Sequence, residues 1–369
     1  MKIAMIGQKG IPSRSGGIEI HVEEISKRLA KRNCEVDVYC RRGYCSNIEE
    51  WHHNGINLKY APYIHSKHLD AITHTFTSTV KALFSGCDIF HYHALGPATL
   101  SFIPRIFGKK VVCTVHGLDW QRGKWGGFAS RYLKFGEFAT AKFPNITINV
   151  SDNLVKYYYE KYGVDTVFIP NGVEKHDRVE PERIGPSYGL EKDGYILFLA
   201  RLVPEKGAHY LIAAYKKLNT DKKLVIAGGA SHSTHYEKSL HLLADNNPNI
   251  IFTGFVSGTL LEELYSNAYL YVLPSDIEGL PISLLEAMSF GNCCLTSDIP
   301  ENQAVVKGMG MTFRKGDVED LYRGLERLLN NHATVYKMKE NIQKYVCDNY
   351  NWEDITISTH EVYKGLISK

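Results

Sequence analysis

Short apolar runs rich in β-branched residues alternate with amphipathic helical patterns along almost the whole chain. In the first half, the runs predict strands near residues 3–6, 36–39, 88–91, 111–115, 147–150 and 167–169. In the second half, they predict strands near residues 195–200, 224–227, 250–252, 270–273, 293–296 and 311–313. Because strands that alternate with helices form parallel sheets from βαβ units, the pattern predicts an α/β fold.

Helical patterns separate these runs. After the first strand, Ile18, Val22, Ile25 and Leu29 recur at helical spacing, and Asn33 is expected to end that helix. Helices are also predicted near residues 207–217, 236–245, 259–266 and 281–289. The segment 174–189 is rich in charge, proline and glycine, which predicts a linker. It divides the chain into two doubly wound, Rossmann-like domains, 1–173 and 190–351, with ligands expected in a cleft at their strand ends.

Composition favours a globular protein of two domains. The 369 residues, of which 44% are hydrophobic, can bury two cores. The eight cysteines form no C-x-x-C pair and several lie in apolar runs, which is typical of reduced, buried residues. The sequence contains no signal-peptide pattern and no apolar stretch of about 18 residues. We therefore expect a cytoplasmic protein without a membrane-spanning helix.

Charge is distributed unevenly. Residues 1–170 contain 22 Lys and Arg against 14 Asp and Glu, whereas residues 171–369 contain 21 against 26. A basic first half favours contact with phosphates or with the anionic inner face of a membrane. A chance asymmetry between two solvated surfaces explains the same numbers equally well. Nucleic acid is not an expected partner, because no recognised binding motif accompanies the charge.

The segment 278–288, EGLPISLLEAM, places two carboxylates around the start of a predicted helix. Pro281 fits the first helical position, which puts Glu278 in the preceding loop and Glu286 in the second turn. The N–H groups of the first turn attract phosphate, and the two carboxylates can accept hydrogen bonds from a sugar and a ribose. The order of carboxylate, helix N-terminus and carboxylate along the chain matches the order of sugar, diphosphate and ribose in a nucleotide-sugar. An isolated E-x7-E spacing, however, more often belongs to an ordinary amphipathic helix.

Two further loops follow predicted strands. Gly16 and Gly17 open the first helix, and without a Cβ atom their backbone can approach a ligand closely. Arg201 and Lys206 lie between a strand and a helix, where a guanidinium and an ammonium can clamp a diphosphate and stabilise a leaving nucleotide. The alternatives are an unremarkable strand–helix turn and a solvated pair of cations.

Histidines and aromatic residues mark the first domain. His116 ends a predicted strand, where it can contact a donor sugar, although a lone histidine is more often structural. No histidine spacing indicates a metal site, and His91 and His93 are better explained by packing or an acceptor-side role. The segment 120–138 interleaves aromatic residues with Arg122, Lys124 and other cations. It can stack on sugars, bind an acceptor pyrophosphate, lie on a membrane or simply pack as a helix.

Together these motifs resemble glycosyltransferase family 4, the retaining transferases of the GT-B fold. The resemblance spans nearly the whole chain and rests on residues in a fixed order, namely Gly16, Gly17, His116, Ser151, the segment 170–173, Arg201, Lys206, Glu278 and Glu286. It implies two Rossmann-like domains that face a cleft, and a final helix, 352–369, that packs back on the first domain.

The resemblance also implies residue roles. The expected catalytic residues are His116, Arg201, Lys206 and Glu278, with Glu278 on the donor sugar. The expected donor-binding residues are Gly16, Gly17, Gly254, Phe255, Val256, Gly279, Leu280 and Glu286, with Glu286 on the ribose and residues 253–256 near the base. The acceptor side is expected at Asp119, Arg122, Lys124 and Trp125.

The implied reaction is transfer with retention. The nucleotide leaves, the acceptor hydroxyl attacks from the same face, and the donor phosphate helps to take the proton. The reaction needs no enzyme nucleophile, and we expect no cofactor and no metal, because Arg201 and Lys206 stabilise the leaving diphosphate.

A narrower resemblance concerns the donor. The segments 6–29 and 116–126 are similar to a bacterial subgroup often assigned as rhamnosyltransferases of capsular or other surface polysaccharides. It implies dTDP-L-rhamnose as donor and a glycan or lipid-linked glycan as acceptor, although related members use UDP-hexoses or GDP-mannose. Because dTDP contains a deoxyribose, Glu286 could accept a hydrogen bond only from its 3′-hydroxyl. Many members carry an acid directly after the cleft histidine, whereas here Gly117 follows and the acid is Asp119, whose role stays open.

Two other functions fit the same architecture. A nucleotide-sugar 2-epimerase converts a UDP-sugar without an acceptor. A non-catalytic, lectin-like or scaffold subunit of a polysaccharide-assembly complex transfers nothing. The presence of Arg201, Lys206, Glu278 and Glu286 argues against the silent subunit, which has no need of all four.

Overall fold

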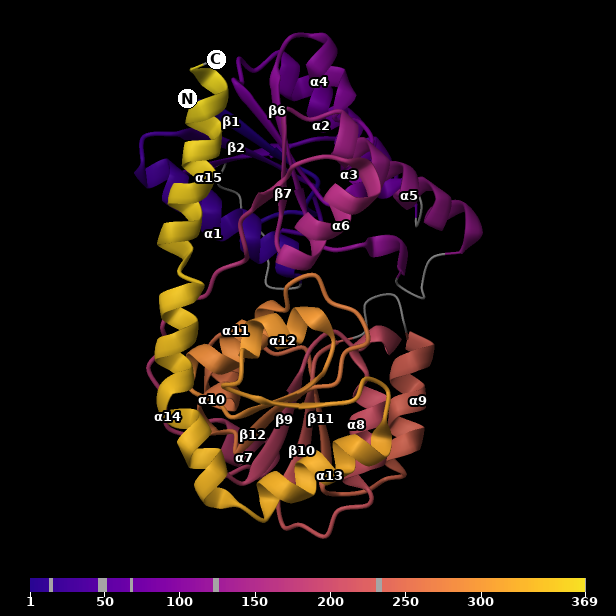
Figure 1. Ribbon diagram of the computed structural model, residues 1–369, viewed down its shortest axis with the longest axis vertical. Helices are drawn as coiled ribbons and strands as arrows, with labels where there is room; N and C mark the ends of the chain where they lie inside the picture. The colour runs from indigo at the N-terminus through magenta and orange to yellow at the C-terminus, as the bar shows by residue number, and fades with distance from the viewer. Residues whose placement is uncertain (13–15, 46–51, 67–68, 122–125, 230–233, 369) are drawn as a thin grey trace. The chain divides into compact units, whose positions relative to one another are not determined.

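The protein consists of two compact units. The computed structural model describes residues 1–12, 16–45, 52–66, 69–121, 126–229 and 234–368 (Figure 1). Unit 1 comprises Met1–Gly172 and Trp352–Lys369, and unit 2 comprises Val173–Asn351. The chain therefore returns to its first unit at the end, where the last helix begins at Trp352.

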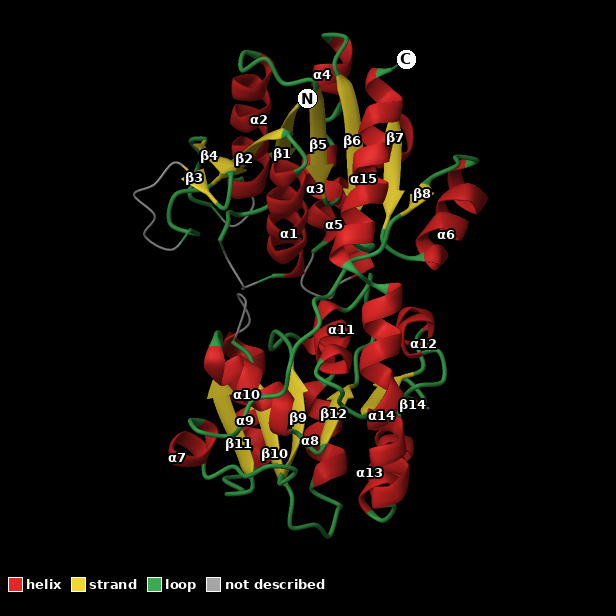
Figure 2. Cartoon of the chain, turned by 90° about the vertical axis from the view of Figure 1, so that its left-hand side faces the viewer, coloured by secondary structure: helices red, strands yellow, loops and turns green. Residues whose placement is uncertain are grey.

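Unit 1 is built on an eight-stranded sheet in the order β3-β4-β2-β1-β5-β6-β7-β8 (Figure 2). The strands are β1 (Lys2–Ile6), β2 (Glu35–Cys40), β3 (His52–His53), β4 (Ile56–Tyr60), β5 (Ile89–His93), β6 (Lys110–Val115), β7 (Ile146–Asn149) and β8 (Val167–Phe168). All neighbours pair in parallel except β3 and β4. The helices are α1 (Gly17–Lys31), α2 (Asp70–Leu83), α3 (Leu95–Ala98), α4 (Phe102–Ile106), η1 (Asp119–Gln121), α5 (Gly127–Lys142), α6 (Asp152–Tyr162) and α15 (Trp352–Ile367).

Helices cover both faces of this sheet, as the alternation of residues in β1 shows. Ile3 and Met5 point into a core shared with α1 and α15, whereas Ala4 and Ile6 point into a core shared with α2. Period-two alternation sends successive side chains to opposite faces, so a strand that is apolar throughout is buried on both sides. The predicted doubly wound sheet is confirmed.

Unit 2 contains a six-stranded, fully parallel sheet in the order β11-β10-β9-β12-β13-β14. The strands are β9 (Tyr195–Leu199), β10 (Lys223–Ala227), β11 (Ile250–Gly254), β12 (Leu270–Leu273), β13 (Cys294–Ser297) and β14 (Met311–Phe313). The helices are α7 (Ile184–Tyr188), η2 (Pro204–Lys206), α8 (Ala208–Tyr215), α9 (Thr234–Ala244), α10 (Thr259–Asn267), α11 (Ile282–Ser289), α12 (Pro300–Val306), α13 (Val318–Leu329) and α14 (His332–Asn349). Each predicted strand is present in the two sheets, within two residues of the expected bounds.

The segment 174–189 is not the linker that the sequence predicts. It belongs to unit 2 and contains helix α7. Arg178 donates hydrogen bonds to the carbonyls of Phe290 and Gly291, and the Glu263 carboxylate accepts from the backbone N–H of Arg183. These contacts join residues 80 or more positions apart, so composition alone gave no sign of them.

Candidate functional site

Lys206 and Glu278 form an ion pair in unit 2. The Lys206 Nζ atom lies 2.5 Å from Glu278 Oε1, and the side chains are 14% and 6% exposed. The hydroxyl of Ser275 donates a second hydrogen bond to the same oxygen at 2.6 Å. Lys206 ends η2, which follows β9, and Glu278 follows β12; because β9 and β12 are neighbours in the sheet, their carboxyl ends bring the two loops together.

A glycine allows this close approach. Gly207 follows Lys206 with φ +71°, a conformation that side chains rarely adopt. A Cβ atom at Gly207 would lie 2.0 Å from the carbonyl oxygen of Pro274. The backbone N–H of Asp276 also donates to the carbonyl of Glu205 at 2.9 Å, which ties the two loops together. The backbone thus fixes where Lys206 and Glu278 meet.

Helix α11 begins directly after this loop. The sequence predicts Pro281 as the first helical residue. In the structure, Pro281 is the residue before the helix, with an extended backbone of φ −77° and ψ 102°, and Ile282 is the first helical residue. Glu286 lies in the second turn, as predicted, and is half-buried. The hydroxyl of Tyr265 donates to Glu286 Oε2 at 3.2 Å, and that of Tyr271 donates to Ser283 Oγ at 3.0 Å. Two buried tyrosines therefore line this side of the helix.

The other predicted donor-binding residues of unit 2 differ in exposure. Gly254 ends β11 with φ +69°, and Phe255 follows with its side chain 58% exposed. Val256 and Leu280 are buried, and Gly279 is buried beside Leu280, so the side chains of Val256 and Leu280 pack inside the unit. Within this group, Phe255 offers the most exposed apolar surface.

Arg201 follows β9 and is half-buried, on the same connection as Lys206. Unit 2 thus brings Arg201, Lys206, Glu278 and the start of α11 to the carboxyl ends of β9 and β12. A cationic pair, a carboxylate and a helix N-terminus together provide contacts for a phosphorylated ligand.

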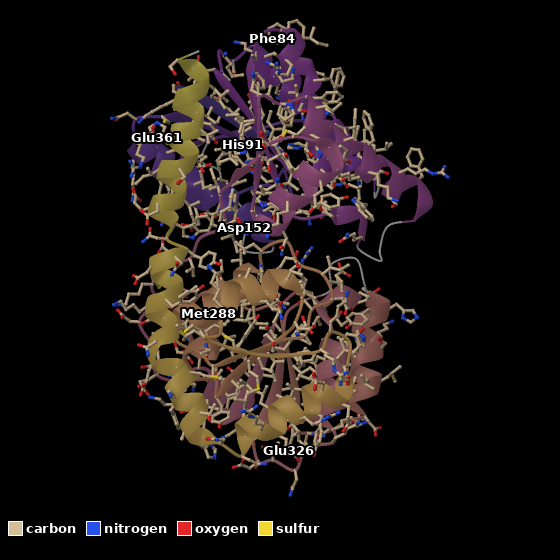
Figure 3. The ribbon with its side chains drawn as sticks, viewed as in Figure 1. Phe84, His91, Asp152, Met288, Glu326 and Glu361 are labelled. Carbon is tan, nitrogen blue, oxygen red and sulfur yellow. The ribbon has the colours of Figure 1, made fainter. Side chains whose placement is uncertain are left out.

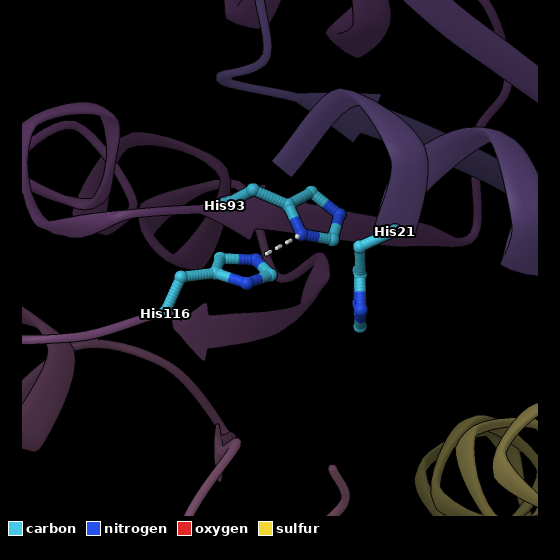
Figure 4. Close-up of side chains that lie close together, drawn as sticks. All are labelled: His21, His93 and His116. Atoms are coloured by element: carbon cyan, nitrogen blue, oxygen red, sulfur yellow. Dashed lines mark hydrogen bonds between the residues drawn. The ribbon is translucent and has the colours of Figure 1, made fainter. Parts of the chain in front are cut away.

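His116 belongs to unit 1. It follows β6 and precedes Gly117, whose φ of +138° turns the chain away from the sheet. His116 Nε2 lies 3.2 Å from His93 Nδ1, at the end of the neighbouring strand β5 (Figure 4). The ring of His21, from α1, lies 4.7 Å from the ring of His116, edge to face. Sequence spacing does not show this cluster, because its members come from three elements.

Burial keeps the inner histidines of unit 1 neutral. It lowers the pKa of His21 to about 4, against the opposing effect of a hydrogen bond to Asn171. Burial also holds the pKa of His93 and of His91 well below the usual value, and neighbouring imidazoles act in the same direction. Both ring nitrogens of His91, in the interior of unit 1 (Figure 3), are bonded, to Tyr363 and Thr114.

The residues that can hold a metal ion are His21, His93 and His116. One ligand nitrogen from each histidine lies within 4.8 Å of the other two. Among the described residues, these three form the one group of at least three His, Cys, Asp or Glu side chains that could share a metal ion. The sequence predicts no metal for the reaction.

The glycine loop closes onto the start of α1. Gly16 caps this helix and Gly17 is its first residue. A Cβ atom at Gly16 would lie 2.3 Å from Glu19 Oε2, while Glu19 Oε1 accepts a hydrogen bond from the backbone N–H of Lys9 at 3.0 Å. Glu19 therefore folds back across Gly16 and ties the loop to the helix.

The expected acceptor-side residues are described only in part. Asp119 lies in η1, three residues after His116, whereas Arg122, Lys124 and Trp125 lie outside the described residues. The indole of Trp120 donates to Glu137 Oε2 at 2.6 Å, which anchors η1 to α5.

Glu137 is a buried carboxylate that the sequence did not single out. Besides Trp120, it accepts hydrogen bonds from Tyr157 at 3.0 Å, Lys161 at 2.7 Å and Tyr162 at 2.6 Å. Burial alone raises its pKa, but these four donors together lower it. The ionised carboxylate of Glu137, on α5, therefore connects this helix to η1 and α6 through hydrogen bonds.

Comparison with known families decides what the two units are. The model of Glycosyltransferase Family 4 matches residues 15–176, and that of Glycosyl transferases group 1 matches residues 182–346. The chain is a GT-B glycosyltransferase. This transferase is 27% identical to an uncharacterized glycosyltransferase of Methanocaldococcus jannaschii, over 99% of this chain and 98% of the relative.

Two solved structures are similar to the transferase over its whole length. Sucrose-phosphate synthase from Thermosynechococcus elongatus matches with a TM-score of 0.86 and 20% identity, over 100% of this chain and 99% of that one. HepE of Anabaena in complex with UDP-glucose matches with a TM-score of 0.82 and 17% identity, over 99% of this chain and 100% of that one. These structures confirm the predicted fold class, and the family models confirm the prediction of a glycosyltransferase. Retention, metal independence and the rhamnosyltransferase subgroup stay predictions.

Proposed function

We propose that this transferase moves a sugar, with retention, from a nucleotide-sugar donor to a glycan or lipid-linked glycan. The observation that carries the proposal is the Lys206–Glu278 ion pair, beside the loop that leads into α11. A cation held 2.5 Å from a carboxylate at a helix N-terminus provides one partner for a diphosphate and one for a sugar hydroxyl.

Donor binding exchanges the partners of this pair. Lys206 turns from Glu278 to the diphosphate, whose charge exceeds that of one carboxylate, and Arg201 adds a second cation. Glu278 then accepts a hydrogen bond from the donor sugar. Because both cations are in place before the bond breaks, they stabilise the charge that develops on the leaving nucleotide. The donor phosphate takes the proton of the acceptor hydroxyl as the new bond forms.

Glu286 and Phe255 hold the rest of the nucleotide. Tyr265 orients the carboxylate of Glu286, which accepts a hydrogen bond from the ribose. The exposed ring of Phe255 lies against the base. The resemblance to family 4 also assigns His116, Gly16 and Gly17 of unit 1 to the donor.

No metal takes part in this mechanism. Arg201 and Lys206 supply the positive charge that a divalent ion supplies elsewhere. Turnover of the purified protein is expected to persist in EDTA, and EDTA-sensitive turnover would contradict this.

The donor that we propose is dTDP-L-rhamnose, and the product belongs to a surface polysaccharide. The support is the likeness of residues 6–29 and 116–126 to the rhamnosyltransferase subgroup. HepE, solved with UDP-glucose, makes a UDP-hexose the alternative to test.

A donor panel tests the proposal. The protein is incubated separately with dTDP-L-rhamnose, UDP-glucose, UDP-galactose, UDP-N-acetylglucosamine and GDP-mannose, while thermal stability and nucleotide release are followed. Stabilisation and slow hydrolysis with dTDP-L-rhamnose are expected, and the same result with another donor corrects the sugar. Conversion of UDP-N-acetylglucosamine without nucleotide release indicates a 2-epimerase. If no donor stabilises the protein or releases its nucleotide, with or without glycan acceptors, the proposal is overturned in favour of a non-catalytic subunit.

We further propose that helix α5 touches the membrane that holds a lipid-linked acceptor. Phe128, Phe135 and Phe138 are exposed on this helix, and the exposed cations Arg131 and Lys134 lie between them. Apolar rings beside cations suit an anionic lipid interface. No helix in the described parts of the chain is long and apolar enough to span a bilayer.

Liposome sedimentation tests this contact. Replacing both cations, Arg131→Glu with Lys134→Glu, should release the protein from anionic vesicles. The control is Lys238→Glu on helix α9 of unit 2, which should sediment like the wild type. Equal sedimentation of all three proteins would refute the membrane contact.

A further inference from the structure

We propose that His21, His93 and His116 form a binding site for one zinc-class divalent ion, and that the bound ion withdraws His116 from sugar transfer. The site lies wholly within unit 1 and consists of three imidazole nitrogens from α1, β5 and the end of β6 (Figure 4). Imidazole is a preferred ligand of zinc, and three protein ligands with an open fourth position make a complete site.

The spacing of the nitrogens fits tetrahedral coordination. With Zn–N bonds of about 2.0–2.1 Å, two ligand nitrogens lie ~3.3 Å apart. His93 Nδ1 and His116 Nε2 are already 3.2 Å apart. All three ligand nitrogens lie within 4.8 Å of one another, so the third nitrogen has to close by at most about 1.5 Å.

The hydrogen bonds leave nitrogen lone pairs inside the cluster. His21 Nδ1 lies 2.9 Å from Asn171 Oδ1, and because this oxygen only accepts, Nδ1 carries the proton. His21 Nε2 therefore keeps its lone pair. It is buried and has no hydrogen-bond partner among the described residues. A carbonyl oxygen that orients a histidine from behind is the usual outer contact of a metal ligand.

The effect on catalysis follows from the position of His116. An ion that binds His116 Nε2 replaces its hydrogen bond with His93 Nδ1 and fixes the imidazole that is proposed to contact the donor sugar. Zinc is therefore expected to inhibit transfer, and EDTA to restore it. This consequence rests on the proposed function, whereas metal binding does not.

Zinc binding to the full chain, in competition with a chromophoric chelator and without sugar substrates, tests the site. One ion per chain is expected for the wild type, and at least about tenfold weaker binding for His21→Phe and for His93→Phe. The matched control is His74→Phe, because His74 is equally buried in unit 1 but lies outside the cluster. Asn171→Ala should weaken binding by about 10–100-fold through loss of the outer contact.

Three results separate the outcomes. Melting temperatures identify a variant that fails to fold, and the remaining variants then decide. Absence of a stoichiometric ion, or equal affinity in wild type, His21→Phe and His93→Phe, overturns the site. If zinc binds as predicted but the transfer rate is unchanged at saturation, the inhibitory role is wrong. If no donor is turned over, the proposed function fails while the binding result stands.

Discussion

Replacing Lys206 by alanine removes the cation that is proposed to receive the diphosphate. In the free protein, the change leaves the Glu278 carboxylate, which is 6% exposed, with a hydrogen bond from the Ser275 hydroxyl at 2.6 Å. Loss of one partner of a fully buried ion pair costs about 3–5 kcal/mol. Because the Lys206 side chain is itself 14% exposed, we expect the free energy of unfolding to fall by about 2–3 kcal/mol.

The loss of turnover is expected to be larger than the loss of stability explains. A preorganised charge at the leaving group is worth about 10²–10³ in turnover. The assay measures kcat and KM for nucleotide release, well below the melting temperature of the variant, together with a denaturant titration. Lys206→Met combined with Glu278→Gln removes both charges, so it should recover most of the stability while turnover stays low.

An exposed ion pair of the same unit provides the control. Lys217 and Glu319 also lie 2.5 Å apart, but their side chains are 49% and 52% exposed. Lys217→Ala should change stability by less than about 1 kcal/mol and leave turnover unchanged. If Lys206→Ala retains turnover within about threefold of the wild type, the role of Lys206 as a preorganised cation is refuted.

Three further changes have defined outcomes. Glu286→Ala should raise KM for the donor by about tenfold, with a smaller effect on kcat, because one charged hydrogen bond to the ribose is lost; an unchanged KM would remove Glu286 from the donor site. Glu137→Gln should lower the melting temperature at pH 7. Since its four hydrogen-bond donors hold the pKa of Glu137 below its usual value in the folded protein, the difference from the wild type should shrink as the pH falls through that lowered pKa. A constant difference would show that the charge of Glu137 is not stabilising. The protein should lose stability as the pH falls from 6.5 to about 4, because His21 is protonated in the unfolded chain but stays neutral in the folded protein. For this residue, the loss is on the order of 3 kcal/mol. His21→Phe should make the stability less dependent on pH, and an equally steep curve would contradict burial of His21 as the cause.

Most of the parallel strands were predictable, because strands that are buried on both faces appear in the sequence as continuous apolar runs. The hairpin of β3 and β4 was missed, although its signal was present. Asn54 and Gly55 both adopt positive φ, and an Asn-Gly pair between strands is typical of a tight turn. The strands that flank the pair, His52–His53 and Ile56–Tyr60, are short, and the polarity of the first hides the alternation.

The candidate site was predicted residue by residue, but its arrangement was not. Lys206 and Glu278 were each recognised from their loops, yet their ion pair joins residues 72 positions apart. It exists because β9 and β12 are neighbours in the sheet, and strand order is not visible in the hydrophobic pattern. For the same reason, the proximity of His21 to His116 required the fold.

The most direct test of the account is a crystal structure of the protein with a nucleoside diphosphate of the donor that is turned over. The account predicts the diphosphate at the N-terminus of α11, with Lys206 Nζ within hydrogen-bond distance of a phosphate oxygen and no longer bound to Glu278. A nucleotide bound elsewhere, or a Lys206–Glu278 pair that stays intact beside a bound diphosphate, would contradict it.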